Sequence, residues 1–349
     1  MAYRIAVIRG DGIGPELVDS ALAVLAAVGV ALDFEFLDGG ADTYRRTGEA
    51  LSAGAVAAVR DADATLKGPT GLPHIRKPDG TEAGLLGGIL RNGLDLYANV
   101  RPIRLLPGAA PRLRVEPGEI DYVIVRENTE GLYAARGKGV GNARAMADTL
   151  LVTREGCARI ARHAFELAGR RSGAPADGVR RVTCVDKANV LRTMAFFRAV
   201  FLEVARDYPD IEAECRYVDA TAQALVTEPE RFDVIVTENM LGDILSDLGG
   251  GTVGGVALCP SGNIGADAAY FEPIHGTAPA LAGQDKANPI SQILAAAMML
   301  DHLGETAAAD AVRAAVNAAL ASGAVQLDRF GGTRHGTAAT TAAIVAALR

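Results

Sequence analysis

The chain has 349 residues, of which 49% are hydrophobic and 22% are charged, and its formal net charge is −7 at pH 7. This length is sufficient for two domains, and the acidic balance disfavours a general nucleic-acid surface. Charged residues or glycines interrupt every 20-residue window, so we expect no membrane-spanning helix and no membrane partner.

The start of the chain and its cysteines are typical of a cytoplasmic protein. The first ten residues lead directly into a strand pattern and lack the apolar segment and cleavage site of a signal peptide. Cys157, Cys184, Cys215 and Cys259 are widely spaced and form no C-x-x-C pair. We therefore expect reduced thiols in the cytoplasm, and neither a disulfide framework nor a zinc site.

The first 70 residues alternate strands with helices, as in an α/β protein. Hydrophobic periodicity predicts strands at 3–8, 32–37 and 64–67, and helices at 16–28 and 52–60. Between the first strand and helix, Gly10-Asp-Gly-Ile-Gly-Pro15 predicts a tight turn. Its third glycine is misplaced for G-x-G-x-x-G, which disfavours a standard Rossmann dinucleotide site.

In the middle of the chain, charged or amide side chains follow the predicted strands. After a Gly- and Pro-rich loop at 68–80, we expect helices at 85–96, 153–169 and 192–206, and extended segments at 97–102, 120–125, 181–185, 212–218 and 232–236. The residues after four strands are Arg126, Lys187, Asp219 and Glu238-Asn239. Ligands of α/β sheets bind beyond the carboxyl ends of strands, so this edge is the expected site. The last third is mostly helical, with helices at 289–303, 307–320 and 338–348.

Asp243 and Asp247 follow the last of these strands and lie four residues apart on a predicted helix. At this spacing both carboxylates lie on the same face. Two like charges this close favour a cation between them, and Mg2+ or Mn2+ prefers oxygen ligands. A solvated acidic face is the commoner interpretation of such a pair, but the position after a buried strand favours a metal site.

Six stretches, in order, resemble motifs of the β-decarboxylating dehydrogenases, which act on 3-isopropylmalate, isocitrate, homoisocitrate, tartrate or D-malate. They are Gly10-Asp-Gly-Ile-Gly-Pro-Glu16, Leu94-Asp-Leu-Tyr-Ala-Asn-Val-Arg-Pro102, Val125-Arg-Glu-Asn-Thr-Glu-Gly-Leu-Tyr133, Asp186-Lys-Ala-Asn189, Gly242-Asp-Ile-Leu-Ser-Asp247 and His275-Gly-Thr-Ala-Pro279 with residues 283–289. Each motif alone is weak. Six in the right order make a chance resemblance implausible.

The resemblance implies an α/β, non-Rossmann, two-domain fold of the isopropylmalate dehydrogenase type. Residues 1–97 and 254–349 would form a large cofactor-binding domain, and residues 98–253 a small domain with the interface of a homodimer. Enzymes of this family oxidise the C2 hydroxyl of a substituted D-malate by hydride transfer to NAD or NADP and then release the β-carboxylate as CO2. The implied activity is that of an NAD(P)-dependent oxidoreductase that uses Mg2+ or Mn2+.

The same resemblance assigns roles to individual positions. Tyr133 and Lys187 match the catalytic acid and base, and Asp219, Asp243 and Asp247 match the metal ligands. Lys187 and Asp219 would reach the site from the partner subunit. Substrate carboxylates would meet Arg91, Arg101 and Arg126, and the positions matched to cofactor binding are Glu272, His275, Gly276, Ala278, Leu281 and Asn288.

The chemistry suits these residue types. Guanidinium groups bind carboxylates through paired hydrogen bonds without losing their charge. Lys187 would act as a general base if neighbouring positive charge and partial burial lowered its pKa. Tyr133 would then donate a proton to the enol carbon.

Two specificities depend on local departures from the family pattern. At Ala280-Leu281 the chain carries neither the Asp of NAD enzymes nor the Lys-Tyr of many NADP-dependent isocitrate dehydrogenases. We predict NAD, with NADP as the alternative if Arg329 or Arg334 binds the 2′-phosphate. Leu85-Leu86 resembles the apolar pocket of isopropylmalate dehydrogenases, and such a pocket does not satisfy a buried carboxylate, so 3-isopropylmalate is the expected substrate.

Other functions remain alternatives. Arg126-Glu-Asn-Thr-Glu-Gly131 is closer to the isocitrate, tartrate and archaeal branches, which keeps isocitrate, homoisocitrate, tartrate and D-malate as possible substrates. A non-catalytic regulatory subunit would have lost a catalytic or metal position, yet every matched position is filled. A metal-dependent hydrolase would need a nucleophile or phosphate loop that the sequence does not supply.

Overall fold

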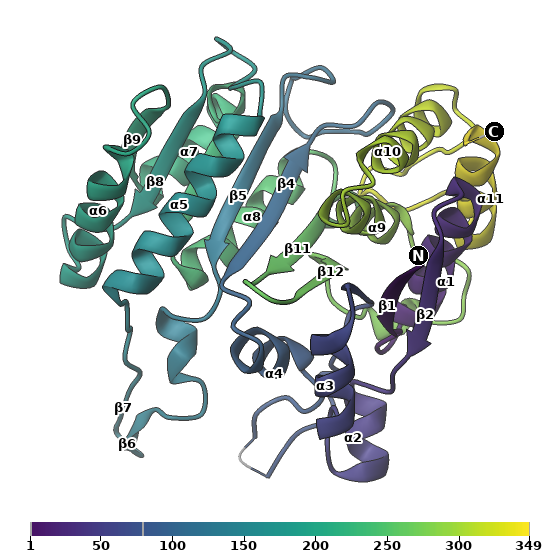
Figure 1. The fold of residues 1–349 in the computed structure, drawn as a ribbon, viewed down its shortest axis with the longest axis horizontal. Helices are drawn as coiled ribbons and strands as arrows, with labels where there is room; N and C mark the ends of the chain where they lie inside the picture. Colours follow the sequence, from purple (N-terminus) through teal and green to yellow (C-terminus); the bar gives the residue numbers. More distant parts are fainter. Residues whose placement is uncertain (1, 79, 349) are drawn as a thin grey trace. The chain divides into compact units, whose positions relative to one another are not determined.

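The computed structural model describes residues 2–78 and 80–348 and divides the chain into two compact units (Figure 1). Unit 1 comprises Met1–Leu96, Leu106–Arg112 and Val253–Arg349, and unit 2 comprises Tyr97–Leu105 and Leu113–Thr252. The outer ends of the predicted large domain, Met1 and Arg349, lie outside the described residues. Cofactor binding by one domain and dimer formation by the other stay predictions.

Unit 1 is built on five adjacent strands. In spatial order they are β2 (Leu32–Phe36), β1 (Tyr3–Ile8), β3 (Ala64–Lys67), β12 (Ala269–Pro273) and β11 (Pro260–Ile264), all parallel except β11. Its helices are α1 (Gly14–Val28), α2 (Ala41–Thr47), α3 (Ala53–Asp61), α4 (Leu86–Gly93), α9 (Ile290–His302), α10 (Thr306–Ala321) and α11 (Thr337–Ala347), with short 3-10 turns at Val256–Leu258 and Pro279–Leu281.

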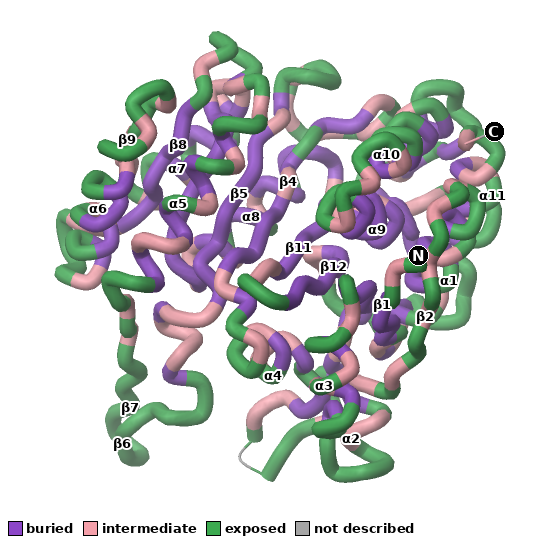
Figure 2. Tube along the Cα trace, in the orientation of Figure 1, coloured by how far each residue is buried: buried purple, intermediate pink, exposed green. Residues whose placement is uncertain are grey.

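The sheet of unit 1 is covered on both faces, because its strands carry apolar residues on both. Ile5 and Val7 of β1 belong to a core shared with α1, α9, α10 and α11. Ala6 and Ile8 point the other way, into a core shared with α3 and α4. Residues 5–8 of β1 are therefore buried (Figure 2). A continuous apolar run of this kind is typical of a parallel strand covered on both faces.

Unit 2 has a similar plan. Its strands lie in the order β4 (Ala98–Arg104), β5 (Asp121–Glu127), β10 (Val234–Thr237), β8 (Arg181–Asp186) and β9 (Glu212–Tyr217), and only β4 is antiparallel to its neighbour. The helices are α5 (Arg154–Arg170), α6 (Arg192–Ala205), α7 (Val218–Thr227) and α8 (Asn239–Thr252), with 3-10 turns at Leu132–Ala135 and Pro229–Arg231. Helix α5 packs against α6, and α7 packs against α8. A separate hairpin pairs β6 (Val140–Asn142) with β7 (Ala145–Ala147).

The α/β prediction is confirmed, and most predicted elements are present within a few residues. The sequence analysis did not identify α2, α7, the β6–β7 hairpin, β11 or β12. These elements are short, and β11 and β12 contain the residues Pro260, Gly262 and Pro273, which weaken a strand signal. Missing β12 matters, because it carries Tyr270 and Glu272.

The cysteines and helices agree with two further expectations. No disulfide joins any of the four cysteines, all of which lie in the described residues. Over residues 2–78 and 80–348, none of the helices has both the length and the apolar character needed to cross a bilayer.

Asp233 provides a test of how unit 2 is stabilised. Its fully buried carboxylate accepts hydrogen bonds from Arg171 Nε (2.6 Å) and from the backbone N–H of Arg181 (3.2 Å). Replacing Asp233 by Ala leaves both donors without this acceptor, so we expect the free energy of unfolding to fall by about 2–3 kcal/mol. Urea unfolding would measure the change. The control Asp19→Ala removes only an exposed ion pair with Arg9 and should change stability by no more than about 0.5 kcal/mol.

Candidate active site

The predicted site residues of unit 2 lie where its parallel strands end. Arg126 is near the end of β5, Lys187 follows β8, Asp219 follows β9, and Asn239 opens α8 after β10. Because β5, β10, β8 and β9 are parallel neighbours, their carboxyl ends share one edge of the sheet. The edge predicted from sequence is thus a single surface of unit 2.

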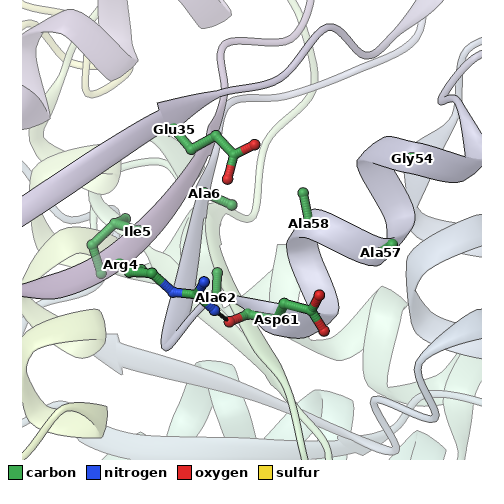
Figure 3. Close-up of a pocket in the computed structure, with 9 residues that line it drawn as sticks. All are labelled: Arg4, Ile5, Ala6, Glu35, Gly54, Ala57, Ala58, Asp61 and Ala62. Atoms are coloured by element: carbon green, nitrogen blue, oxygen red, sulfur yellow. Dashed lines mark hydrogen bonds between the residues drawn. The ribbon is translucent and has the colours of Figure 1, made fainter.

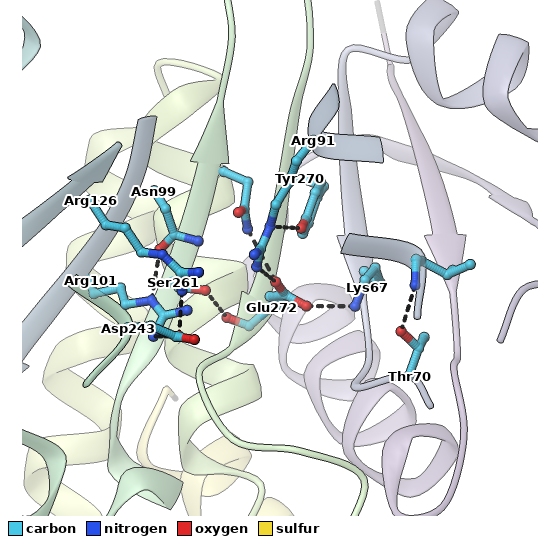
Figure 4. A network of polar contacts seen from close by, with 12 residues as sticks. Lys67, Thr70, Arg91, Asn99, Arg101, Arg126, Asp243, Ser261, Tyr270 and Glu272 are labelled. Atoms are coloured by element: carbon cyan, nitrogen blue, oxygen red, sulfur yellow. Dashed lines mark hydrogen bonds and ion pairs between the residues drawn. The ribbon is translucent and has the colours of Figure 1, made fainter. Parts of the chain in front are cut away.

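Asp243 on α8 is the acceptor around which three other predicted site residues meet. Its Oδ1 accepts hydrogen bonds from Arg126 Nη1 and from Arg101 Nη1, the latter at 3.2 Å. Its Oδ2 accepts a hydrogen bond from the Tyr133 hydroxyl at 3.1 Å. Arg101, Arg126 and Asp243 are drawn in Figure 4. The Arg101 and Arg126 side chains are only 5% and 1% exposed, whereas that of Asp243 is 37% exposed. Two buried cations thus meet one carboxylate that is open to solvent.

Both guanidinium groups make further hydrogen bonds to neutral polar side chains. Arg126 Nε and Nη2 donate to Asn239 Oδ1 at 3.0 and 2.7 Å. Arg101 Nε donates to Asn99 Oδ1 at 2.8 Å, and its Nη1 donates to Ser246 Oγ at 2.6 Å. The sequence analysis did not assign a role to Asn99 or Ser246. These bonds leave little rotational freedom, so the two charges are pre-organised.

Tyr133 is suited to hold a proton. Burial raises the pKa of its hydroxyl, and the negative charge of Asp243 and the hydrogen bond to it raise the pKa further. The Arg126 guanidinium, which lies 5.6 Å from the ring centroid, lowers it again. The net shift is upward, so the hydroxyl stays protonated at neutral pH.

Asp243 and Asp247 fit a divalent cation in chemistry, but they are an incomplete ligand set. Asp247 is exposed one helical turn after Asp243. Although Asp247 keeps exposed surface, the protein atoms around its carboxylate remove part of the solvent, and its pKa is raised for this reason. The Arg101 charge lowers the pKa and the Asp243 charge raises it, so the net shift is upward. Carboxylate oxygens suit Mg2+ or Mn2+. However, no group of three His, Cys, Asp or Glu residues within the described part of the chain is arranged to hold a metal.

Lys187 and Asp219 are brought together, as an ion pair of 2.5 Å. This hydrogen bond is the main reason that the pKa of Asp219 is lowered. The side chains are 30% and 67% exposed. The charged group that contacts Lys187 is thus a carboxylate, opposite in sign to the positive neighbour assumed in the sequence analysis.

Arg91 lies in unit 1, within a second polar network (Figure 4). Its Nε donates to the Tyr270 hydroxyl at 2.9 Å, and its Nη2 donates to Glu272 Oε1 at 3.2 Å. Glu272 Oε2 pairs with Lys67 at 2.5 Å, and Asn263 donates to Oε1 at 3.3 Å. Lys67 is 2% exposed and was missed, although a lysine that ends a buried strand is a signal for a buried ion pair. Convergence of Arg91 with Arg101 and Arg126 stays a prediction.

Glu272 lies in β12, and the other predicted cofactor residues of unit 1 follow this strand. His275 Nε2 lies 3.0 Å from Ser291 Oγ, and burial lowers the pKa of the imidazole, so the ring is neutral at pH 7. A Cβ added to Gly276 would meet open space. Ala278 has φ 36° and ψ 58°, a left-handed conformation that costs an alanine about 1–2 kcal/mol. Leu281 is 39% exposed.

Two residues predicted to contact the cofactor or the substrate have buried side chains that make their contacts within the chain. Asn288 is buried, and its amide donates to Gly331 O at 2.7 Å while its Oδ1 accepts from the Ile290 N–H at 3.0 Å. Leu86 is fully buried in the core between α3, α4 and β1. Of the Leu85-Leu86 pair, Leu85 is the side chain with exposed surface.

Two surface hollows of unit 1 are separate from these residues. One, of about 300 Å3, is lined by Arg4, Glu35, Asp61 and small residues of α3 and β1 (Figure 3). The other, of about 420 Å3, lies between β2, α2 and α3. No predicted site residue lines either hollow.

Comparisons with known proteins agree with the motifs. The family model described as isocitrate/isopropylmalate dehydrogenase matches residues 4–348. The chain is 43% identical to a "3-isopropylmalate/3-methylmalate dehydrogenase" of Methanocaldococcus jannaschii over 94% of both chains. It is 45% identical to an "isocitrate/homoisocitrate dehydrogenase" of Thermus thermophilus over 100% of this chain and 99% of that one. The structure of an isocitrate dehydrogenase from Methylococcus capsulatus is similar, with a TM-score of 0.88, 38% identity and 99% coverage of both chains.

The motifs, the α/β architecture and these similarities agree over nearly the whole chain. The protein is a decarboxylating dehydrogenase that acts on a CH–OH group, and it belongs to the isocitrate/isopropylmalate dehydrogenase family.

Proposed function

We propose that this enzyme oxidises the C2 hydroxyl of a 3-substituted D-malate with NAD and a divalent cation and then releases the β-carboxylate as CO2. The observation that carries the proposal is the contact of Arg101, Arg126 and Tyr133 with Asp243. These contacts support the assignment of Arg101 and Arg126 to substrate carboxylates, of Tyr133 to proton donation and of Asp243 to metal binding.

Charge balance suggests how substrate enters. The buried Arg101 and Arg126 have the Asp243 carboxylate as a counter-charge. Substrate carboxylates would replace it through paired hydrogen bonds. The oxygens of Asp243 would then be released towards a cation, with Asp247 beside them.

The protein groups divide the proton chemistry. In the proposed dimer, where Asp219 would bind the metal instead of pairing with Lys187, an uncharged Lys187 would accept the proton of the C2 hydroxyl, and Tyr133 would donate a proton to C3 after the bond to the carboxylate breaks. NAD, when bound through residues 272–288, supplies the hydride acceptor. Mg2+ or Mn2+, when bound by Asp243, Asp247 and Asp219 of a second chain, supplies Lewis-acid stabilisation of developing negative charge on the substrate.

The proposal includes a homodimer with shared sites, which would complete the ligand set. One chain pairs Asp219 with Lys187 and leaves Asp243 and Asp247 without a third acidic ligand among the described residues. Ile244, between the two aspartates, is 58% exposed, and Met146 of the β6–β7 hairpin is 69% exposed. Exposed apolar side chains of this kind support contact with a second copy.

The proposed substrate is 3-isopropylmalate, and the proposed nucleotide is NAD. Leu85 presents an apolar surface that suits the isopropyl group of 3-isopropylmalate. Isocitrate, homoisocitrate, tartrate and D-malate are the alternatives. NAD is favoured because Ala280 and Leu281 supply no cation for a 2′-phosphate, and Arg334 donates to Leu327 O. A cytoplasmic location agrees with the absence of disulfides among the four cysteines.

A substrate panel tests the specificity. Initial rates with 3-isopropylmalate, isocitrate, homoisocitrate, D-malate and tartrate, each with NAD and NADP and with Mg2+ or Mn2+, should give the highest kcat/KM for 3-isopropylmalate with NAD. The physical reason is the apolar Leu85 surface and the lack of a cationic side chain at Ala280-Leu281. A preference for isocitrate would refute the substrate, and a preference for NADP would refute the nucleotide.

The metal role is tested with Asp243→Asn. The amide keeps the size but removes a charged ligand, so turnover dependent on Mg2+ should fall by about 1,000-fold or more. Calorimetric titration with Mn2+ should show the loss of binding directly. The control Asp210→Asn changes an exposed carboxylate of the same unit and should keep normal activity. Wild-type rates and Mn2+ affinity in a folded Asp243→Asn protein would exclude Asp243 as a ligand.

Shared sites are tested by mixing two inactive variants. In a heterodimer of Lys187→Ala and Asp243→Asn chains, one site receives intact Lys187 and Asp243 from different chains, and the other receives neither. A randomly reassociated equal mixture should recover about a quarter of wild-type activity, because half of its dimers have one good site. Differently tagged chains allow the heterodimer to be isolated. A verified heterodimer without activity would show that each site belongs to a single chain.

A further inference from the structure

The predicted cofactor loop of unit 1 turns sharply at Ala278. This residue has φ 36° and ψ 58°, whereas side-chain-bearing residues rarely adopt the left-handed region. Ala278 immediately precedes the 3-10 turn Pro279–Leu281, and the Leu281 N–H donates to Ala278 O at 2.9 Å. A strained conformation of this kind persists only where its surroundings hold it.

Thr277, which precedes Ala278, is held by hydrogen bonds to two other loops. Its carbonyl accepts a hydrogen bond from the Ile13 N–H at 2.9 Å, and its hydroxyl donates to Gly71 O at 2.8 Å. A Cβ on Gly12 would lie 2.1 Å from the Thr277 carbonyl oxygen, so the two backbones approach as closely as glycine allows. Thr277 is 6% exposed. It is therefore fixed to two other loops just before the strained residue.

Asp11 joins the loops that hold Thr277. Its carboxylate is 2% exposed and accepts hydrogen bonds from the N–H groups of Gly71 (2.8 Å), Ala41 (2.7 Å) and Asp42 (3.1 Å). Its own N–H donates to Pro69 O at 2.9 Å. Hydrogen bonds from N–H groups to a carboxylate are strong, so Asp11 anchors the Gly71 backbone that in turn accepts from Thr277.

We propose that Asp11 and Thr277 are positioning residues for NAD. They hold Ala278 in its left-handed conformation and so preform the loop at 275–281 before the cofactor binds. A preformed loop binds more tightly because it has less freedom to lose on binding. This inference rests on the proposed use of NAD and assigns a task to two residues that do not themselves contact the reacting atoms.

Substitutions at Thr277 test the proposal. Thr277→Val keeps the shape and removes the bond to Gly71, so the KM for NAD and the dissociation constant of NADH should rise about tenfold, the loss expected for one buried hydrogen bond. The kcat and the KM for the hydroxy acid should change by less than about threefold, because the lost contact affects cofactor binding alone. Thr277→Ser keeps the hydroxyl and should restore affinity. Asp11→Asn, which replaces one acceptor oxygen by a donor, should act in the same direction as Thr277→Val.

The matched control is Thr341→Val. Thr341 is also a buried threonine of unit 1, but within the described part of the chain its hydroxyl donates only to Thr337 O of the same helix α11, at 2.8 Å. Thermal unfolding of each variant would show whether the two valine substitutions cost similar stability. Equal KM values for NAD in Thr277→Val and Thr341→Val would overturn the proposal, since Thr277 would then have a structural role only.

A double variant tests the backbone conformation itself. Glycine reaches positive φ without the strain of alanine, so Ala278→Gly in the Thr277→Val background should recover part of the lost NADH affinity. A further loss of affinity would show that the left-handed conformation is not what Thr277 supports. Failure of the wild-type enzyme to use NAD or NADP would instead refute the proposed function, and so the two failures are distinguishable.

Discussion

Burial of two guanidinium groups against one carboxylate is the constraint on which the candidate site depends. Arg101 and Arg126 have almost no exposed surface, and cations in that position require a nearby anion. Asp243 provides it from α8, while Asn99, Asn239 and Ser246 orient the guanidinium groups. The same contacts that compensate the two buried cations also fix their positions at the candidate site.

Unit 1 uses buried charge in a different way. Lys67 and Arg91 share the Glu272 carboxylate, so a network of opposite charges lies at the end of β12. Asp11 has no such cationic partner among the described residues and is satisfied by backbone N–H groups from two other segments. Both solutions meet the cost of burying charge, and both fix loops that border the predicted cofactor residues.

Local patterns were enough to anticipate the edge of the unit 2 sheet. Each parallel strand there is a short apolar run, and the residue type after it changes abruptly to Arg126, Lys187 or Asp219. The spacing of Asp243 and Asp247 likewise follows from helical geometry alone. The strands β11 and β12 were not predicted, because they contain proline and glycine and because their pairing depends on residues outside the local sequence.

The sequence by itself determined the family, the α/β class and the residue types at the carboxyl ends of the strands, because these depend on periodicity and ordered motifs. Only the tertiary structure decided which groups meet. It paired Lys187 with Asp219, set Asp243 against Arg101 and Arg126, and buried Leu86 and the Asn288 amide within the fold. Such contacts join segments distant in the chain, and their geometry depends on packing that no local pattern records.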